Sequence, residues 1–303
     1  MNHNRKHSVH TIQKNTPEHN APEQNTTVRN TPEHNSVHVA SYTATLQEQY
    51  MTSCQKHKRM IHFARIFILI QFFIVWEILS DFDVIDAFFF SSPSRMTCLF
   101  ISMCQNFEIF YHIAITLFET ILSFLIVNVI SILVAILLLT LNKVSEICEP
   151  YLVVLNSLPK SALAPLIIVW LGTGMKTIIV AGISVAVFGS IITLYSGFCQ
   201  VDEEKMKLIY TLGGNKADII KKVIIPSSVP IILSNMKVNI GLSLVGVIIG
   251  EFLAAKRGLG YLIIYGSQVF QLDLLILSIL ILCMIAMLLY QSIRIIERKL
   301  CKN

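Results

Sequence analysis

The sequence lacks the motifs that would mark an enzyme. It contains no GxxxxGK(S/T) phosphate-binding loop, so we expect that this chain does not hydrolyse ATP itself. It also contains no HExxH and no GxSxG, the signatures of membrane metalloproteases and of serine hydrolases. No basic face is combined with aromatic readers, which argues against a nucleic-acid partner. We therefore expect no catalytic residue and no cofactor in this chain.

Charge is also scarce. Only 14% of the 303 residues are charged, whereas 54% are hydrophobic. Apolar runs of roughly 20 residues recur, which is the length that a helix needs to cross the hydrocarbon core of a bilayer. These features exclude an ordinary soluble domain and predict an all-α membrane protein with several transmembrane helices.

Paired cysteine motifs are absent as well. The seven cysteines are scattered and none forms a CxxC. Cys98 and Cys104 share one segment that we expect outside the cell, so they could form a disulfide, although unpaired cysteines in apolar surroundings are the favoured interpretation. We expect no metal site among them.

Residues 1–58 form a polar segment that differs from the rest of the chain. It carries a small repeat, with Asn-Thr-Pro-Glu-His-Asn at residues 15–20 and again at 30–35, and we expect it to be a disordered cytoplasmic tail. A secretory signal is not expected, because the first apolar run starts near Ile61. Six of the nine histidines lie in the first 38 residues of this tail: His3, His7, His10, His19, His34 and His38. A low-complexity spacer is favoured over a metal-binding tail, because the histidine spacing is loose.

The remaining residues, 59–303, are predicted to form a bundle of about six transmembrane helices. Basic residues precede the first span and follow the last one, so the positive-inside rule places both termini in the cytoplasm. It also places the charged segment 202–230 on the cytoplasmic side. The expected spans cover residues 61–80, 113–141, 151–170, 177–198, 229–254 and 272–292.

Two of these spans contain residues that lipid would not tolerate. Pro159 and Pro165 break the third span, and Lys160 lies beside the first break. Either this span borders a transport pathway, or it is a kinked helix whose lysine reaches the interface. The fifth span carries Asn235, Asn239 and Ser243, which should face protein or a cavity. It also carries Glu251, for which an ion pair with Lys256 or Arg257 is the favoured interpretation, and Gly246 and Gly250, whose spacing predicts close helix packing.

The cytoplasmic segment 202–230 reads as two short amphipathic helices. They are predicted to be hinged at Gly213 and Gly214 and stopped by Pro226. A plain solvated turn with interfacial helices explains the same pattern equally well.

At this segment the chain resembles the permease subunits of bacterial ABC importers. Gly213 and Ile225-Pro226 stand where that family has a conserved glycine and Leu-Pro, while Lys207-Leu208-Ile209 replaces its Glu-Ala-Ala. Residues 91–94, 158–159, 164–166, 170–174, Glu251 and 258–261 are similar to the nitrate, sulfonate and taurine group of these permeases. The likeness covers about residues 65–299.

The resemblance implies a fold like that of type I ABC importer permeases in a bacterial inner membrane. It also implies a homodimer of this chain, two ATPase subunits that bind ATP and Mg²⁺, and an extracytoplasmic substrate-binding protein. The residues expected to dock the ATPase are Lys207, Leu208, Ile209, Leu212, Gly213, Gly214, Ile219, Ile220, Val223 and Pro226. The residues expected along the translocation pathway are Pro159, Lys160, Asn235, Asn239 and Ser243.

The sequence alone does not identify the substrate. The family group suggests a small anion such as nitrate, a sulfonate or taurine, and its relatives suggest a thiamine precursor, another pyrimidine or riboflavin. A hypothesis of a different class is a membrane sensor or scaffold that binds metal through its histidine-rich tail.

Overall fold

The computed structural model describes the chain from Ser91 to Leu300, together with part of the segment before it. The residues described in that earlier segment are 60, 61, 63, 64, 67, 68, 70–80 and 82. The chain divides into two units, Met1–Leu69 and Ile70–Asn303, and the description below concerns the second. The predictions made for residues 1–58, including the tail and its histidines, lie outside the described residues. The described part is helical and contains no strand, which confirms the all-α prediction.

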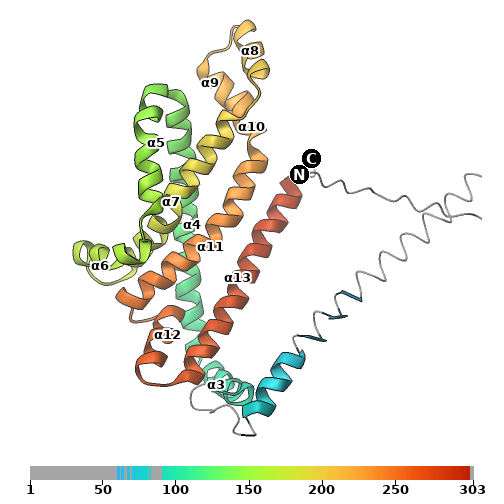
Figure 1. Cartoon of the computed structure of the whole chain (residues 1–303), viewed down its shortest axis with the longest axis vertical. Helices are drawn as coiled ribbons and strands as arrows, with labels where there is room; N and C mark the ends of the chain where they lie inside the picture. Colours follow the sequence, from blue (N-terminus) through green and yellow to red (C-terminus); the bar gives the residue numbers. More distant parts are fainter. Residues whose placement is uncertain are drawn as a thin grey trace, which may run out of the picture. The chain divides into compact units, whose positions relative to one another are not determined.

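Four helices are long and apolar enough to cross a membrane. They are α4 (Glu108–Thr140), α7 (Met175–Cys199), α11 (Val229–Ala254) and α13 (Leu272–Leu300). Their best windows have mean hydropathies of 3.0, 2.3, 1.7 and 2.9. The value for α11 is the lowest because this helix carries the buried asparagines and Glu251. The four helices run along the long axis of the view in Figure 1.

The third predicted span is bent rather than straight. Its two parts, α5 (Asn142–Ser157) and α6 (Lys160–Leu171), meet at 95°, so they form either one broken span or a re-entrant loop. Leu158 between them is extended, with φ −62° and ψ 139°, as expected for a residue that precedes a proline. Pro165 was expected to break the span as well, but it lies inside α6. Only one of the two prolines therefore ends a helix.

The first predicted span is described only in part. Ile70–Ser80 is an apolar helix that is too short by itself to cross a bilayer. The described residues thus contain four spans, or five if the bent pair counts as one, whereas the sequence suggested about six.

Helices α7 and α11 form the centre of the bundle, and α4 packs against both. Close approach depends on glycines that face each other. A Cβ atom added to Gly246 would lie 2.8 Å from the Cα of Gly182, and one added to Gly250 would lie 2.9 Å from the Cα of Ile178. The pair Gly246 and Gly250, predicted to mediate packing, therefore lies directly against α7.

Short helices occupy the two ends of the bundle (Figure 1). At one end lie α3 (Pro93–Gln105) and α12 (Leu259–Gln268). At the other end lie α8 (Glu203–Thr211), α9 (Lys216–Ile219), the π-helix η1 (Ile220–Ile224) and α10 (Ile225–Ser227). The charge pattern places this second end in the cytoplasm.

Candidate functional site

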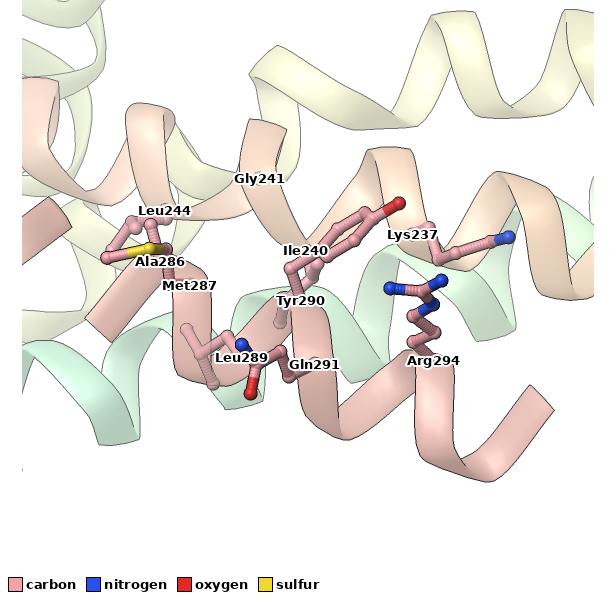
Figure 2. A pocket seen from close by; sticks show the side chains of 10 residues that line it. All are labelled: Lys237, Ile240, Gly241, Leu244, Ala286, Met287, Leu289, Tyr290, Gln291 and Arg294. Atoms are coloured by element: carbon pink, nitrogen blue, oxygen red, sulfur yellow. The ribbon is translucent and has the colours of Figure 1, made fainter. Parts of the chain in front are cut away.

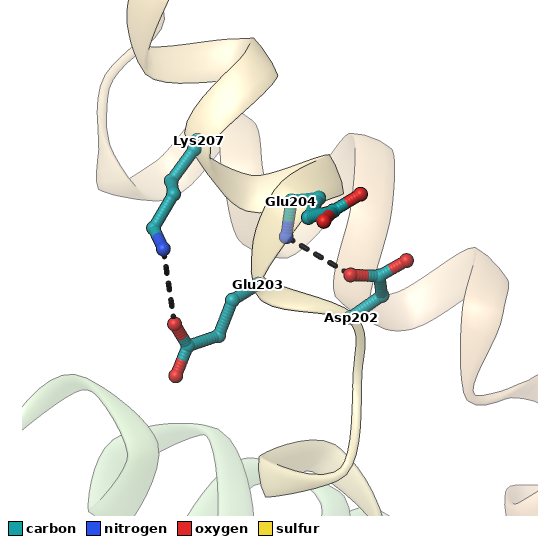
Figure 3. A network of polar contacts seen from close by, with 4 residues as sticks. All are labelled: Asp202, Glu203, Glu204 and Lys207. Carbon is teal, nitrogen blue, oxygen red and sulfur yellow. Dashed lines mark hydrogen bonds and ion pairs between the residues drawn. The ribbon is translucent and has the colours of Figure 1, made fainter.

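The charged cytoplasmic segment begins with a well-capped helix, α8. The Asp202 carboxylate accepts a hydrogen bond from the Glu204 backbone N–H at 2.9 Å, and both glutamates of the first turn lie at the positive end of the helix dipole (Figure 3). Glu203 and Lys207 form an i,i+4 ion pair at 3.2 Å with both side chains more than 70% exposed. Such a pair contributes little stability, so α8 is a helix held by its cap and by packing.

The two glycines reverse the chain after α8. Gly213 has φ +82°, a left-handed conformation that favours glycine. Its N–H donates to the Tyr210 carbonyl at 3.0 Å, and the Gly214 N–H donates to the Ile209 carbonyl at 2.9 Å. These two bonds make a Schellman motif, which ends α8 and satisfies its last carbonyls.

A capping box starts α9 directly after this turn. The Asn215 side chain accepts from the Asp218 N–H at 2.9 Å, and the Asp218 carboxylate accepts from the Asn215 N–H at 3.1 Å. That backbone hydrogen bond, together with Lys222 at 3.1 Å, lowers the pKa of the Asp218 carboxyl. The turn between α8 and α9 is therefore specified by its local sequence.

Pro226 does not stop the second helix, contrary to prediction. The chain widens into the π-helix η1, and Pro226 sits in the first turn of α10. A proline has no N–H and its ring collides with the carbonyl four residues earlier, and a wider turn relieves that collision. The helix axis then changes at Ser228, where α11 begins.

The residues expected to dock an ATPase fall into two groups. Leu208 of α8 and Leu212, the residue that caps the C-terminus of α8, are 58% and 74% exposed and lie roughly 40° apart by the helical period. Ile219 and Val223 are only 5% and 8% exposed, so they are unavailable to a partner in this conformation. Ile209 and Ile220 are partly buried, whereas Lys207, Gly213 and Pro226 are exposed and Gly214 is partly exposed.

The buried group joins the segment to the spans. Ile219 and Ile224 form one cluster with Ala135 of α4 and with Leu194 and Phe198 of α7. A cavity of about 320 Å³ lies beside this cluster, and Tyr210, which the sequence reading missed, is among the residues that line it. Tyr210 lies on the far side of α8 from Leu208, as the helical period requires.

Three predicted pathway residues lie in a buried polar seam between helices. Asn239 donates to Ser190 at 2.9 Å and to Asn128 at 3.1 Å. Asn235 donates to the same Ser190 oxygen at 2.7 Å. Ser243 is fully buried, and its hydroxyl has no partner among the described residues. The seam ties α4, α7 and α11 together, and Asn235 also borders an open cavity of about 330 Å³.

The other two pathway candidates lie at the bend between α5 and α6. Pro159 is exposed and precedes α6 directly. Lys160 is partly buried, and its Nζ donates to the Asn156 Oδ1 at 3.3 Å. Among the described residues, neither Pro159 nor Lys160 forms a hydrogen bond with a residue of the polar seam.

Glu251 lies in a hydrogen-bonded cluster at the opposite end of the bundle. Its carboxylate accepts from the Thr116 hydroxyl at 2.7 Å and from the Gly260 N–H at 2.5 Å, while Thr116 accepts from the Leu259 N–H at 2.8 Å. Nearby, the Gly258 N–H donates to His112 Nδ1 at 2.9 Å. The carboxylate thus caps the first turn of α12.

The expected ion pair of Glu251 is wrong. Among the described residues neither Lys256 nor Arg257 pairs with it, and the Arg257 guanidinium instead stacks 4.9 Å above the Tyr111 ring. Backbone N–H groups and a hydroxyl satisfy this carboxylate in place of a cation.

Glu119 was not singled out in the sequence. It is 2% exposed, its carboxyl group lies beside that of Glu251, and its Oε2 has no partner among the described residues. Glu119 lies inside a long apolar run, three residues after Thr116. An acid at that helical spacing was the feature of the sequence that could have indicated a buried polar site. Among the described residues no group of His, Cys, Asp and Glu could hold a metal ion.

Comparison with known proteins identifies the family. Residues 127–302, more than half of the chain, match the family model described as binding-protein-dependent transport system inner membrane component. An ABC transporter permease protein of Haemophilus influenzae is 26% identical over 72% of this chain and 89% of its own length. A protein of Bacillus subtilis named as an aliphatic sulfonates transport permease is 25% identical over 75% of this chain and 83% of its own length.

A solved structure agrees in fold. The inward-facing methionine ABC transporter MetNI has a chain that aligns with a TM-score of 0.56 at 18% identity, over 64% of this chain and 96% of that one. A sequence identity of 18% supports a similarity of fold and nothing further. Taken together, the helical bundle, its cytoplasmic segment and the family match show that this chain belongs to the binding-protein-dependent inner membrane components, the multi-pass permease subunits of ABC importers, in which a separate subunit hydrolyses ATP.

Proposed function

We propose that two copies of this chain form the pathway of a bacterial inner-membrane importer for a small anion such as a sulfonate or taurine. Each copy docks one ATPase subunit, and a binding protein delivers the substrate from outside. The observation that carries this proposal is the exposed apolar face of α8 at the cytoplasmic end of a permease-family bundle. The choice of substrate rests on the sequence resemblance and on the sulfonate relative.

The docking contact centres on Leu208 and Leu212. Each would bury a large apolar side chain in a groove of the ATPase, and full burial of a leucine stabilises a contact by roughly 1.5–3 kcal/mol. The charges of Glu203, Glu204 and Lys207 lie on the same short helix (Figure 3) and set the orientation. The chain lacks the usual Glu-Ala-Ala, so its docking depends on this leucine pair.

Movement of the ATPase reaches the spans through the second helix of the segment. Ile219 and Ile224 pack against Leu194 and Phe198 near the end of α7, and η1 leads through α10 into α11. A displacement of α8 therefore shifts α7 and α11 together. Alternating access follows if two arrangements of the two copies lie close in energy.

The pathway itself runs between the two copies rather than through one. Asn235, Asn239 and Ser243 are buried inside one copy, while Ser234 and Val238 of α11 are exposed and line the open cavity beside Asn235. These two residues are a candidate wall of the pathway. Lys160 at the α5–α6 bend is a second candidate, because a partly free cation there suits an anion.

The docking proposal is tested by replacing the leucine pair. Leu208→Asp with Leu212→Asp should abolish co-purification of the ATPase and lower substrate-stimulated ATP hydrolysis by the reconstituted complex at least tenfold. The control, Leu208→Met with Leu212→Met, keeps the face apolar and should retain both properties. Complexes that survive the aspartate pair with full ATP hydrolysis would rule out docking through this face.

The substrate is tested with a panel in the same reconstituted complex. Taurine, an alkanesulfonate, nitrate, a thiamine-precursor pyrimidine and riboflavin are each added with the binding protein, and ATP hydrolysis is measured. Stimulation by the sulfonates supports the proposed substrate class. Stimulation by the pyrimidine or by riboflavin alone would replace it with the second candidate and leave the permease function intact.

A further inference from the structure

An open groove of about 480 Å³ lies between α11 and α13, away from the docking segment and the polar seam (Figure 2). Gly241 provides much of its depth, because a Cβ atom added there would meet no atom within 4 Å. Ile240, Leu244, Ala286 and Met287 supply apolar walls. The groove lies on the surface of two membrane-spanning helices, so it faces lipid or a neighbouring protein.

One end of the groove is cationic and the other end is apolar. Arg294 and Lys237 lie together at one end, while Leu244, Ala286 and Met287 lie at the other (Figure 2). Seven residues separate Met287 from Arg294, which is about 10 Å of helix. The apolar surface of α13 continues beyond the groove at Met284, which is 58% exposed, and beside it at Leu288, which is 61% exposed.

The cationic end keeps a free charge. Lys237 Nζ lies 2.8 Å from the Glu297 carboxylate, with both side chains about a quarter exposed. Arg294 is exposed and forms no ion pair with any residue in the described part of the chain. The three side chains together therefore carry a net charge of +1, and an anion is the complementary ligand.

The depth of this end matches a lipid headgroup. Arg294 follows Leu272, the first residue of α13, by 22 residues, or about 33 Å of helix, close to the thickness of the hydrocarbon core. Arg298 and Lys299 follow within two turns. The positive-inside rule places this end of α13 at the cytoplasmic leaflet.

We propose that this groove binds an anionic phospholipid of the cytoplasmic leaflet. The guanidinium of Arg294 donates to the phosphate, in the paired geometry that arginine forms with phosphates, beside the neutral ion pair of Lys237 and Glu297. One acyl chain lies over Gly241 and along Met287 toward Met284. The Tyr290 side chain points toward Lys237, so its hydroxyl lies at the cationic end beside the headgroup (Figure 2).

A second copy of this chain is a poorer occupant. If a twofold axis along the membrane normal closed this groove against its own copy, the two Arg294 side chains would lie close together at the same depth, where their like charges repel. A soluble anion is poorer as well, because it would leave the apolar half of the groove without a partner. A phospholipid satisfies both halves.

Lipid retention on the purified full-length protein tests this proposal. Native mass spectrometry compares retention of phosphatidylglycerol and phosphatidylcholine that are added at equal concentration in detergent. The wild type should retain phosphatidylglycerol preferentially. Arg294→Gln should reduce that preference about fivefold, as expected for removal of one basic contact near a membrane surface.

Two further variants separate the groove from the rest of the helix end. Lys299→Gln removes an exposed cation turned roughly 140° away from Arg294 on the same helix, and it should leave the preference within twofold. Gly241→Leu fills the groove and should lower retention of phosphatidylglycerol without removing any charge. Both variants lie on exposed surface, and thermal unfolding checks that each is folded.

Three results would overturn the proposal. One is an equal loss for Arg294→Gln and Lys299→Gln, which would indicate general interfacial attraction. Another is a combination of two observations: millimolar inorganic phosphate displaces the lipid, and Gly241→Leu does not change retention. That combination would indicate a soluble-anion site. The last is efficient cross-linking between two copies through Gly241→Cys, which would indicate that protein covers the groove.

Discussion

At the scale of single residues, the tightest constraint lies where Gly258 meets Glu251. Gly258 has φ +115° and ψ 168°, a region that is essentially restricted to glycine. A Cβ atom there would also overlap the Glu251 carboxyl group. Gly258 and Glu251 hold the start of α12 against α4 and α11. Backbone strain and a buried carboxylate therefore occur at the same contact.

Gly258→Ala should therefore unfold the outer end of the bundle. We expect a loss of about 3 kcal/mol or more, because strain and overlap add, and the midpoint of thermal unfolding in detergent measures it. Gly241→Ala is the matched control, since its Cβ would enter open space, and it should change stability by no more than about 1 kcal/mol. Equal effects of the two substitutions would contradict this explanation.

The sequence anticipated some of these residues but not their partners. Glu251 and residues 258–261 stood out through the resemblance, and the asparagines of α11 stood out as polar residues in an apolar helix. The partner of Glu251 was misassigned, because Lys256 and Arg257 are close in sequence whereas Thr116 is 135 residues away. A contact over that distance depends on tertiary packing, which a single sequence does not reveal.

At the scale of helices, the cytoplasmic segment combines a locally specified turn with tertiary burial. The Schellman motif at Gly213 and Gly214 and the capping box at Asn215 follow from the local sequence. The amphipathic pattern correctly predicted helical structure at Ile219 and Ile220, the last residue of α9 and the first of η1. It could not tell whether that face packs on the protein's own core or on a partner, because both surfaces are apolar, and the structure places Ile219 in the core.

The capping box should make α9 sensitive to acid. The Asp218 pKa lies below its ordinary value of about 3.9, so this carboxylate stabilises α9 above that value. The contribution is lost as the pH falls through the lowered pKa, when protonation weakens the bonds to the Asn215 N–H and to Lys222. Amide hydrogen exchange of residues 216–219, corrected for intrinsic rates, should accelerate as the pH falls from 5 toward 3. These two pH values lie on either side of the ordinary aspartate pKa of about 3.9.

Asp218→Asn provides the comparison for this prediction. The variant lacks the titrating group, so its corrected exchange should already be faster at neutral pH and should change little with acid. An identical pH dependence in the variant and the wild type would show that another group controls the opening of α9.

At the scale of the whole molecule, hydrophobic length predicted the straight spans well. The expected spans 113–141, 177–198, 229–254 and 272–292 correspond to α4, α7, α11 and α13, with ends that differ by several residues. Pro159 correctly marked the third span as interrupted, whereas Pro165 did not break it. Its 95° bend was not predictable, since a proline specifies where a helix breaks but packing decides the direction of the next one.

The polar segment 1–58 should be dispensable for transport. The family match begins at residue 127, and the resemblance noted in the sequence begins near residue 65, so neither includes this segment. Deletion of residues 1–55 should leave substrate uptake by vesicles within about twofold of the wild type, a change of less than ~0.5 kcal/mol. Loss of uptake at normal membrane abundance would assign this segment a role in transport, and metal-dependent behaviour would favour the sensor hypothesis.

The contact between α7 and α11 has a consequence for a copy of this chain that is not yet assembled with the other subunits. The two helices touch near one end through Gly250 and Ile178, in the middle through Asn239 and Ser190, and near the other end through Gly197 and Ile231. No water-filled passage can open along such a seam without separating the helices. A copy inserted into the membrane in excess of the other subunits should therefore not leak ions, so the cell can make this chain before its partners without discharging the membrane potential.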